Sequence, residues 1–213
     1  ARHASITESG FALVACHEIG HHIGGFPKYR GWATNEGGAD YFATLKCLRN
    51  VLGASAEPGV DPVAAEACAG SFGDEASRNL CQNGAMGGSS VAGLFQALRQ
   101  EPKPAAFNTP DPAQVDQTYD AHPGTQCRMD TYFQGAICKS SVGDDVSNDS
   151  PDPGACTRKG GHQVGFRPRC WYKPPADEPA GAPAIAGRPE LRNIDALKSR
   201  IEALSAALMG RGV

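Results

Sequence analysis

Residues 5–27 read SITESGFALVACHEIGHHIGGFP and decide how the first part of the chain folds. Ser5 and Glu8 have the spacing of a capping box, which satisfies the free amides at the start of a helix. An apolar run follows, and a glycine pair with a proline two residues later ends the pattern. The stretch therefore predicts a helix over residues 5–23.

The second half of this predicted helix carries His17-Glu18-Ile19-Gly20-His21. Two histidines four residues apart lie on the same face of a helix, so both imidazoles can reach one zinc ion at about 2.0–2.1 Å. Glu18 follows the first histidine, where its carboxylate can take a proton from a water held by the metal. The motif predicts a zinc site with His17 and His21 as ligands and Glu18 as general base.

A third ligand has to come from another element, and Glu36 is the candidate. Only 14 residues separate it from His21, and it opens a second predicted helix over residues 35–52, with Thr34 or Asn35 as the cap. Asp40 lies one turn further on the same face, where it can accept the second ring N–H of a ligating histidine. The alternative interpretation is that both carboxylates merely form a solvated first turn that favours the helix dipole.

The rest of the chain predicts a mainly α protein with long irregular segments. With 26 glycines and 16 prolines, the composition indicates much loop, and no strand pattern is strong. Residues 140–188 look irregular. Residues 174–189 are rich in proline and alanine and predict an extended linker, and residues 190–213 repeat apolar side chains at helical spacing. Further helices are expected over residues 61–69, 74–82, 89–101 and 125–138.

Eight cysteines, none in a Cys-x-x-Cys pair, indicate up to four disulfides rather than a thiolate zinc ribbon. The alternative is a set of buried free thiols. Disulfides persist in oxidising compartments, so we expect a periplasmic or secreted protein. Sequence proximity suggests pairing Cys68 with Cys81 and Cys156 with Cys170.

The net charge and the hydropathy of the chain indicate which kinds of partner to expect. The formal net charge is −3, which indicates no nucleic-acid partner. No apolar run approaches the roughly 20 residues that a membrane span needs. The expected partner is a protein or peptide substrate, and the predicted helix over residues 190–213 is expected either to dock on its own domain or to dimerise.

Three motifs together resemble the gluzincin metallopeptidases, and more narrowly the CAAX-prenyl endopeptidase and HtpX type family. The first is the His-Glu-x-x-His segment. The second, Asn35 to Ala43 (NEGGADYFA), is similar to the family's Glu-x-x-Ala-Asp-x-x-Ala element. The third is His122-Pro123 with Arg128-Met129 downstream, similar to a His-Pro element followed by arginine and an aliphatic residue.

The resemblance implies a minimal zincin-like (gluzincin) catalytic domain over residues 1–173. It implies one Zn²⁺ ion bound by His17, His21 and Glu36, with Glu18 as the general base. Asp40 is expected to contact a ligand rather than the metal itself. In some relatives the histidine of the His-Pro element covers the metal as a gate, which suggests that role for His122; the alternative is an ordinary loop histidine. Arg128 is expected to orient a carboxylate or the substrate chain.

The predicted function is a zinc-dependent endopeptidase that hydrolyses peptide bonds with a water activated by Glu18. His122, Arg128 and Tyr119 are the candidate donors to the developing oxyanion. One alternative is a zinc-containing, non-catalytic binding or chaperone-like module on a gluzincin scaffold. A second is a disulfide-stabilised structural protein in which the histidine motif is a coincidence.

Overall fold

The protein is mainly α in a computed structural model, which describes residues 5–178. The only strands in that range are two short ones, which pair as an antiparallel hairpin between α1 and α2. The elements in chain order are α1 (Glu8–Ile23), β1 (Lys28–Tyr29), β2 (Ala33–Thr34), α2 (Glu36–Phe42), the π-helical turn η1 (Ala43–Cys47), α3 (Leu48–Val51), α4 (Pro62–Ser71), α5 (Glu75–Arg99) and α6 (Thr125–Ile137).

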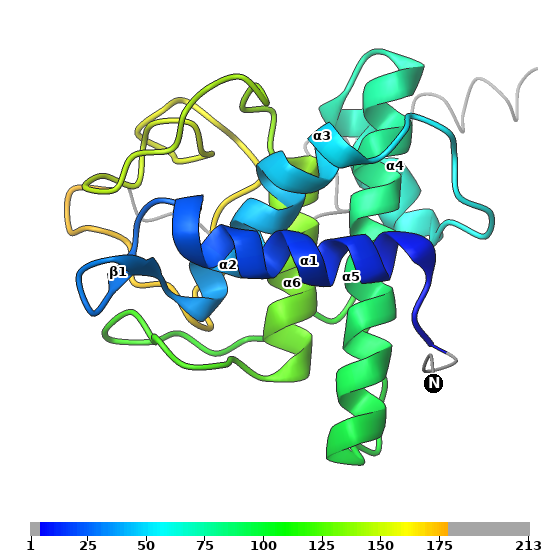
Figure 1. The fold of residues 1–213 in the computed structure, drawn as a ribbon, viewed down its shortest axis with the longest axis horizontal. Coiled ribbons are helices and arrows are strands. Elements are labelled where there is room, and N and C mark those ends of the chain that lie inside the picture. Colours follow the sequence, from blue (N-terminus) through cyan, green and yellow to red (C-terminus); the bar gives the residue numbers. More distant parts are fainter. Residues whose placement is uncertain (1–4, 179–213) are drawn as a thin grey trace, which may run out of the picture.

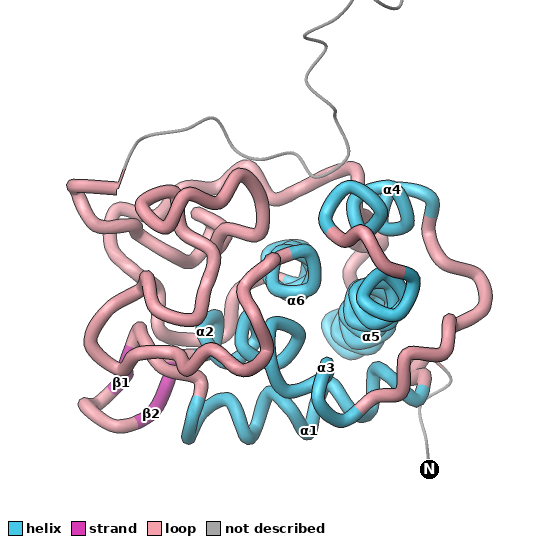
Figure 2. Tube along the Cα trace, turned by 90° about the horizontal axis from the view of Figure 1, so that it is seen from above, coloured by secondary structure: helices cyan, strands magenta, loops and turns pink. Residues whose placement is uncertain are grey.

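The helices and the loops occupy different halves of the molecule. Helices α5 and α6 run side by side, and α1 crosses them (Figure 1). Seen from above, irregular segments fill the other half, beyond α2 and α6 (Figure 2). Leu13 of α1, Val91 of α5 and Tyr132 of α6 belong to one buried cluster, so the crossing point is a packed core.

Helix α1 ends at Ile23, as the glycine pair predicts, but it begins at Glu8 rather than at residue 5. The Thr7 side chain caps it by accepting a hydrogen bond from Gly10 N at 3.1 Å. The predicted capping box of Ser5 and Glu8 is therefore wrong, since Thr7 supplies the same kind of oxygen closer to the helix.

The predicted helix over residues 35–52 is confirmed as the continuous series α2, η1 and α3. Asn35 is its cap, because its Oδ1 accepts from Gly38 N at 2.9 Å. The π-helical turn adds a residue within the series, and its Thr44 hydroxyl donates to Tyr132 O of α6 at 2.7 Å.

The predictions of separate helices over residues 74–82 and 89–101 are wrong, because α5 is one helix of 25 residues. Its interior glycines lower helix propensity but permit close packing. A Cβ at Gly88 would lie 2.7 Å from Tyr132 Cβ, so the glycine lets α6 approach the backbone of α5. Tertiary packing thus outweighs the local preference. Helices α4 and α6 agree with the predictions over 61–69 and 125–138.

All eight cysteines form disulfides. The pairs are Cys16–Cys47, Cys68–Cys81, Cys127–Cys170 and Cys138–Cys156. The pairing of Cys68 with Cys81 is confirmed, and that of Cys156 with Cys170 is wrong. Each of the latter two bonds a cysteine of the α6 region instead, so the disulfides tie the irregular half to α6.

Four disulfides fit an oxidising environment. Among residues 5–178, no helix combines the length and apolar character that crossing a membrane requires. Residues 140–178 contain no helix or strand, in agreement with their irregular sequence. Most of the linker expected over 174–189, and the whole helix expected over 190–213, lie outside the described residues.

Candidate metal centre

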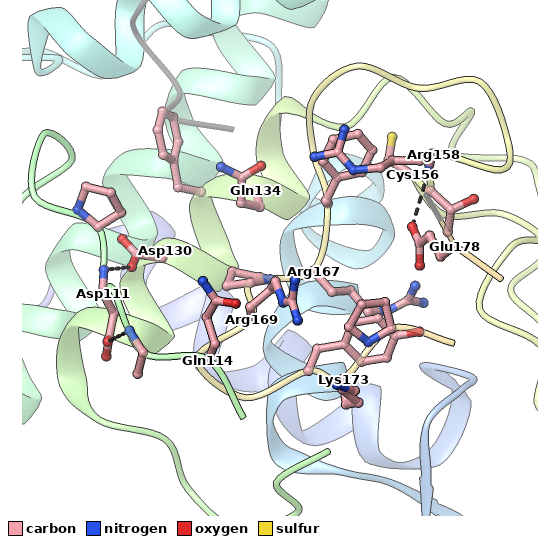
Figure 3. A pocket seen from close by; sticks show the side chains of 18 of the residues that line it. Asp111, Gln114, Asp130, Gln134, Cys156, Arg158, Arg167, Arg169, Lys173 and Glu178 are labelled. Carbon is pink, nitrogen blue, oxygen red and sulfur yellow. Dashed lines mark hydrogen bonds between the residues drawn. The ribbon is translucent and has the colours of Figure 1, made fainter. Parts of the chain in front are cut away.

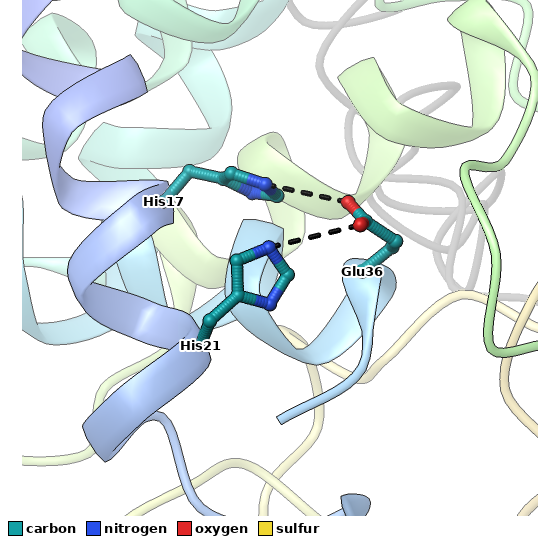
Figure 4. A group of neighbouring side chains, drawn as sticks. All are labelled: His17, His21 and Glu36. Atoms are coloured by element: carbon teal, nitrogen blue, oxygen red, sulfur yellow. Dashed lines mark ion pairs between the residues drawn. The ribbon is translucent and has the colours of Figure 1, made fainter. Parts of the chain in front are cut away.

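The side chains of His17, His21 and Glu36 converge between α1 and the start of α2 (Figure 4). The Nε2 atom of His17 lies 3.3 Å from Glu36 Oε2, and that of His21 lies 3.7 Å from Glu36 Oε1. Each residue offers one ligand atom, and these three atoms lie within 4.8 Å of one another. Two imidazole nitrogens and one carboxylate oxygen at this spacing are a donor set suited to zinc.

The other nitrogen of each ring already has an acceptor. His17 Nδ1 lies 2.7 Å from Asp40 Oδ1, and His21 Nδ1 lies 2.8 Å from the backbone oxygen of Thr34. In the neutral ring these contacts place the proton on Nδ1, so that Nε2, which faces Glu36, is the nitrogen available to a metal. Metal-binding histidines characteristically have such partners, which fix the tautomer and the orientation of the ring.

Asp40 is itself held by Arg128 of α6. Arg128 Nε donates to Asp40 Oδ2 at 2.8 Å, and Nη2 donates to Asp40 Oδ1 at 2.7 Å. Asp40 is fully buried, and Arg128 is 3% exposed. Burial alone would raise the pKa of Asp40, but the Arg128 charge and the His17 contact together lower it, so the carboxylate stays ionised. Arg128 therefore orients a carboxylate, one of its two expected roles.

The sequence brings α1 and α2 together through a glycine inside the histidine motif. A Cβ at Gly20 would lie 3.0 Å from both the Cα and the carbonyl oxygen of Ala39. Any larger residue would push the two helices apart and separate the histidines from Glu36. The β1–β2 hairpin then fixes Thr34, whose hydroxyl donates to Gly25 O at 2.7 Å and whose carbonyl accepts from His21.

Glu36 Oε2 is a buried oxygen without a hydrogen-bond partner. Its contacts with His17 and His122 have ion-pair distances, but neither has hydrogen-bond geometry. Burial alone would raise the pKa of Glu36, but the three nearby imidazoles outweigh it, so this pKa is lowered overall. Burial likewise lowers the pKa of His17, while Asp40 and Glu36 outweigh it and raise that pKa to about 9. The site therefore attracts positive charge, and a cation fits its orphaned acceptor.

His122 reaches the same carboxylate from a loop. Its Nε2 lies 3.2 Å from Glu36 Oε2, although 61% of its side chain is exposed. The loop is attached to α2, because Asn35 Nδ2 donates to Tyr119 O at 3.3 Å and to Asp120 Oδ1 at 3.1 Å. His122 is thus near the site but outside the set of three ligand atoms.

Glu18 and Tyr119 are the predicted residues with the least constrained side chains. Glu18 is exposed on α1, and its carboxylate has no hydrogen bond or ion pair with another residue in the range 5–178. Tyr119 is 47% exposed and bonds the site through its backbone only. Both side chains are accessible to a bound molecule, whereas Arg128 is buried against Asp40.

Sequence reasoning missed three contributors to the site. The contacts of Thr34 O and Tyr132 OH, the latter 3.2 Å from Arg128 Nη2, leave no local signal because they depend on the tertiary fold. Gly20 did leave a signal in the sequence, since a glycine inside a predicted helix indicates close packing against another element. A second geometric group, Asp111 with Cys127 and Cys170, is not a metal site, because the two sulfurs form a disulfide.

Comparisons with family models, with curated proteins and with solved structures found no match for the chain.

Proposed function

We propose that the protein is a zinc-dependent endopeptidase with a minimal zincin-like fold. One observation carries the proposal: His17 and His21 each use Nδ1 for an internal contact and direct Nε2 toward Glu36, whose Oε2 is buried without a hydrogen bond. A coincidental motif would not require both rings to be oriented in this way. This arrangement fits two histidine ligands, each oriented by a hydrogen bond from its other ring nitrogen, and one carboxylate ligand.

The residues would divide the work as follows. A zinc ion bound by His17, His21 and Glu36 would supply Lewis-acid polarisation of the substrate carbonyl and lower the pKa of water. Glu18, accessible on α1 beside His17, would take the proton from that water and deliver it to the leaving amine nitrogen. Asp40 and Arg128 would hold the His17 ring throughout.

His122 is proposed as the residue that contacts the reacting group from the loop side. Its Nε2 lies near Glu36 and most of its side chain is exposed, so it can either cover the metal or donate to a developing oxyanion. Replacing His122 with alanine separates the two roles. Loss of a gate would leave or raise the cleavage rate, whereas loss of an oxyanion donor would lower kcat by about 10²–10³-fold.

The test of the proposal compares cleavage of casein and of a fluorogenic peptide library by the wild type and by Glu18→Gln. Bound zinc is measured in both by mass spectrometry. We expect stoichiometric zinc in both proteins and loss of cleavage in the variant. Glu8→Gln is the matched control, because Glu8 lies on the same helix one turn before the apolar run. Equal cleavage by the wild type and Glu18→Gln would refute the mechanism.

One observation favours a second candidate, a zinc-containing binding or chaperone-like module. Within residues 5–178 the only strands are the two-residue pair β1 and β2, so this part of the chain has no long edge strand to pair with an extended substrate. Stoichiometric zinc without cleavage of any peptide in the library would favour this alternative.

A periplasmic or secreted location is proposed with either function. Four disulfides support it, because such bonds are rare in the reducing cytosol. Intact mass before and after reduction of protein from its native source tests the point. An increase of eight hydrogens is expected, and unchanged mass would contradict the location.

A further inference from the structure

A cavity of about 610 Å³ lies in the irregular half of the molecule, lined by residues of α6 and of the loops before and after it (Figure 3). Helix α6 supplies Asp130, Phe133 and Gln134 to this cavity, whereas its Arg128 contacts Asp40. The volume is typical of sites that bind small organic molecules. Aromatic rings form much of the apolar wall: Phe107, Phe133, Phe166 and Tyr172.

Unsatisfied donors collect in this wall. Among residues 5–178, four buried side-chain polar atoms have no hydrogen-bond partner, and three of them belong to Arg167, Arg169 and Tyr172. The fourth is the Glu36 oxygen of the metal centre. Because a buried polar group without a partner costs about 1–3 kcal/mol, a concentration of them at one cavity indicates a missing ligand.

Within residues 5–178, neither of the two arginines forms an ion pair with a carboxylate. Arg167 is 7% exposed, and its terminal nitrogens donate to the backbone oxygens of Pro151 and Phe26 at 3.0 and 3.3 Å. The guanidinium of Arg169 has no hydrogen bond or ion pair with any residue in the described range. In Figure 3 these two side chains lie next to each other. A planar guanidinium pairs preferentially with carboxylate or phosphate oxygens.

The carboxylates of the cavity are already engaged by donors. Asp130 accepts from Asp111 N and Gln126 Nε2, both at 2.7 Å. Asp111 accepts from Ala113 N at 2.9 Å, and Glu178 accepts from Arg158 N at 3.2 Å. Lys173 also lines the cavity, so its charged groups are not predominantly acidic. Within the described residues, neither Arg167 nor Arg169 has a carboxylate partner, and the Nε atom of each has no acceptor.

Tyr172 completes the donor set. Its ring lies 5.4 Å from the Arg167 guanidinium, and its residue is 4% exposed. Burial raises the pKa of Tyr172 to about 12, with Arg167 opposing the rise, so the hydroxyl keeps its proton and remains a donor at neutral pH. The corner formed by these side chains therefore offers donors of two kinds to an anion.

We propose that this cavity binds a small organic carboxylate with an apolar body. Its oxygens accept hydrogen bonds from Arg169, Arg167 and Tyr172, and its body lies against the phenylalanine wall. The free C-terminus of an apolar peptide and a free aromatic acid share this chemistry. The site is separate from the metal centre and does not depend on the proposed peptidase activity.

The test is isothermal titration calorimetry on the complete chain. The probes are 3-phenylpropionate, an acetylated Ala-Phe dipeptide with a free carboxyl group, the amide of each, and inorganic phosphate. We expect one carboxylate or both to bind at least about tenfold more tightly than the matching amide. The tighter of the two identifies a free acid or a peptide C-terminus as the source.

Variants locate the binding. Arg169→Gln and Tyr172→Phe should each weaken carboxylate binding, the first by about tenfold or more. Tyr172→Phe removes only a hydroxyl that has no hydrogen-bond partner, so we expect this variant to fold. It therefore tests the proposal even if Arg169→Gln fails to fold. Lys159→Gln removes a positive charge outside the cavity and should leave affinity within about twofold, as should Glu18→Gln at the metal centre.

Three results would overturn the proposal. One is equal affinity for carboxylate and amide, and another is affinity for phosphate equal to that for the organic acids, since the apolar body would then contribute nothing. The third is the absence of binding by the complete chain.

Discussion

The proposed metal centre and the proposed carboxylate-binding cavity are built in opposite ways on the two sides of α6. At the metal centre the helices α1 and α2 supply all three ligand atoms, and the unsatisfied group is an acceptor, Glu36 Oε2. In the cavity irregular segments supply most of the wall, and the unsatisfied groups are donors on Arg167, Arg169 and Tyr172. One side therefore suits a cation and the other an anion.

Different interactions keep the two sites rigid. Backbone hydrogen bonds within the helices, the close contact at Gly20 and the Cys16–Cys47 disulfide between α1 and η1 hold the proposed metal centre. Disulfides hold the cavity, since Cys127–Cys170 and Cys138–Cys156 connect the loops to the two ends of α6. Perturbing one source should affect one site more than the other.

The largest effect is expected from Asp40→Asn. The substitution leaves the Arg128 charge buried without its partner, which costs about 3–5 kcal/mol of stability. It also removes the acceptor behind His17, which should weaken zinc affinity by about 10–100-fold. Urea unfolding and competition with a chromophoric chelator measure the two effects.

Asp116→Asn is the control for that substitution, because Asp116 is exposed in the loop that precedes His122. It should change stability by less than about 0.5 kcal/mol. If Asp40→Asn were no more destabilising than this control, the buried pair would not be the link between α2 and α6.

Glu36→Gln should come next. The amide keeps the size of the side chain but loses the negative charge that complements a cation, so we expect at least about 100-fold weaker zinc binding. Stability should change little, because Oε2 has no hydrogen bond to lose. Elemental analysis after dialysis against a chelator gives the stoichiometry.

His22→Gln provides the matched control on α1. His22 follows His21 but is exposed, and its ring lies 5.7 Å from that of Trp32 rather than at the metal centre. This variant should retain full zinc stoichiometry. Loss of zinc from both variants would mean that the metal binds elsewhere.

Removing Cys138–Cys156 tests the independence of the two sites. This disulfide spans 18 residues, for which chain entropy predicts a stabilisation of about 3 kcal/mol, and Cys156 lines the cavity. The double alanine variant should lose carboxylate affinity but keep its zinc affinity within about threefold. Calorimetry with 3-phenylpropionate and chelator competition measure the two affinities.

Replacing Cys68 and Cys81 with alanine supplies a comparable loss elsewhere. This disulfide spans 13 residues and connects α4 with α5, and neither of its cysteines lines the cavity. Its removal should lower the free energy of unfolding by a similar amount, without weakening carboxylate binding more than zinc binding. Equal loss of zinc and carboxylate affinity in both variants would show that the two halves unfold together.

The sequence predicts the helical half of the molecule better than the irregular half. The histidine pair was predictable because helical periodicity fixes which side chains share a face, and Glu36 because it opens the next predicted helix, 14 residues after His21. The length of α5 was not, because Gly88 contacts Tyr132 far away in the chain. The Cys138–Cys156 and Cys127–Cys170 pairs were not either, since their spacing allows many connectivities.

The cavity was the least predictable feature. Arg167 and Arg169 look like solvated surface residues in the sequence. Only the fold reveals that the Nε atom of each is buried and, among residues 5–178, has no hydrogen-bond partner. Irregular segments have no period from which the direction of a side chain can be inferred. A site made of such segments therefore requires coordinates, whereas a site made of two helices does not.

The smallest effect concerns Asp130, on the cavity side of α6. Burial raises its pKa to about 6, although hydrogen bonds from Asp111 N and Gln126 oppose the rise. A folded-state pKa above the unfolded value of about 3.9 means that the folded state binds the proton more tightly. The stabilisation is complete below about pH 4 and is lost as the pH rises through about 6. It amounts to less than about 3 kcal/mol.

Urea unfolding of the wild type and of Asp130→Asn at intervals from pH 4 to pH 8 isolates this contribution. The free energy of unfolding of the wild type should fall relative to that of the variant across this range, because only the wild type loses the proton at position 130. Zinc affinity compared at one pH should be the same in both proteins, since Arg128 rather than Asp130 contacts Asp40. Parallel pH profiles would show that Asp130 titrates normally, and a change in zinc affinity would show that α6 does not separate the two sites.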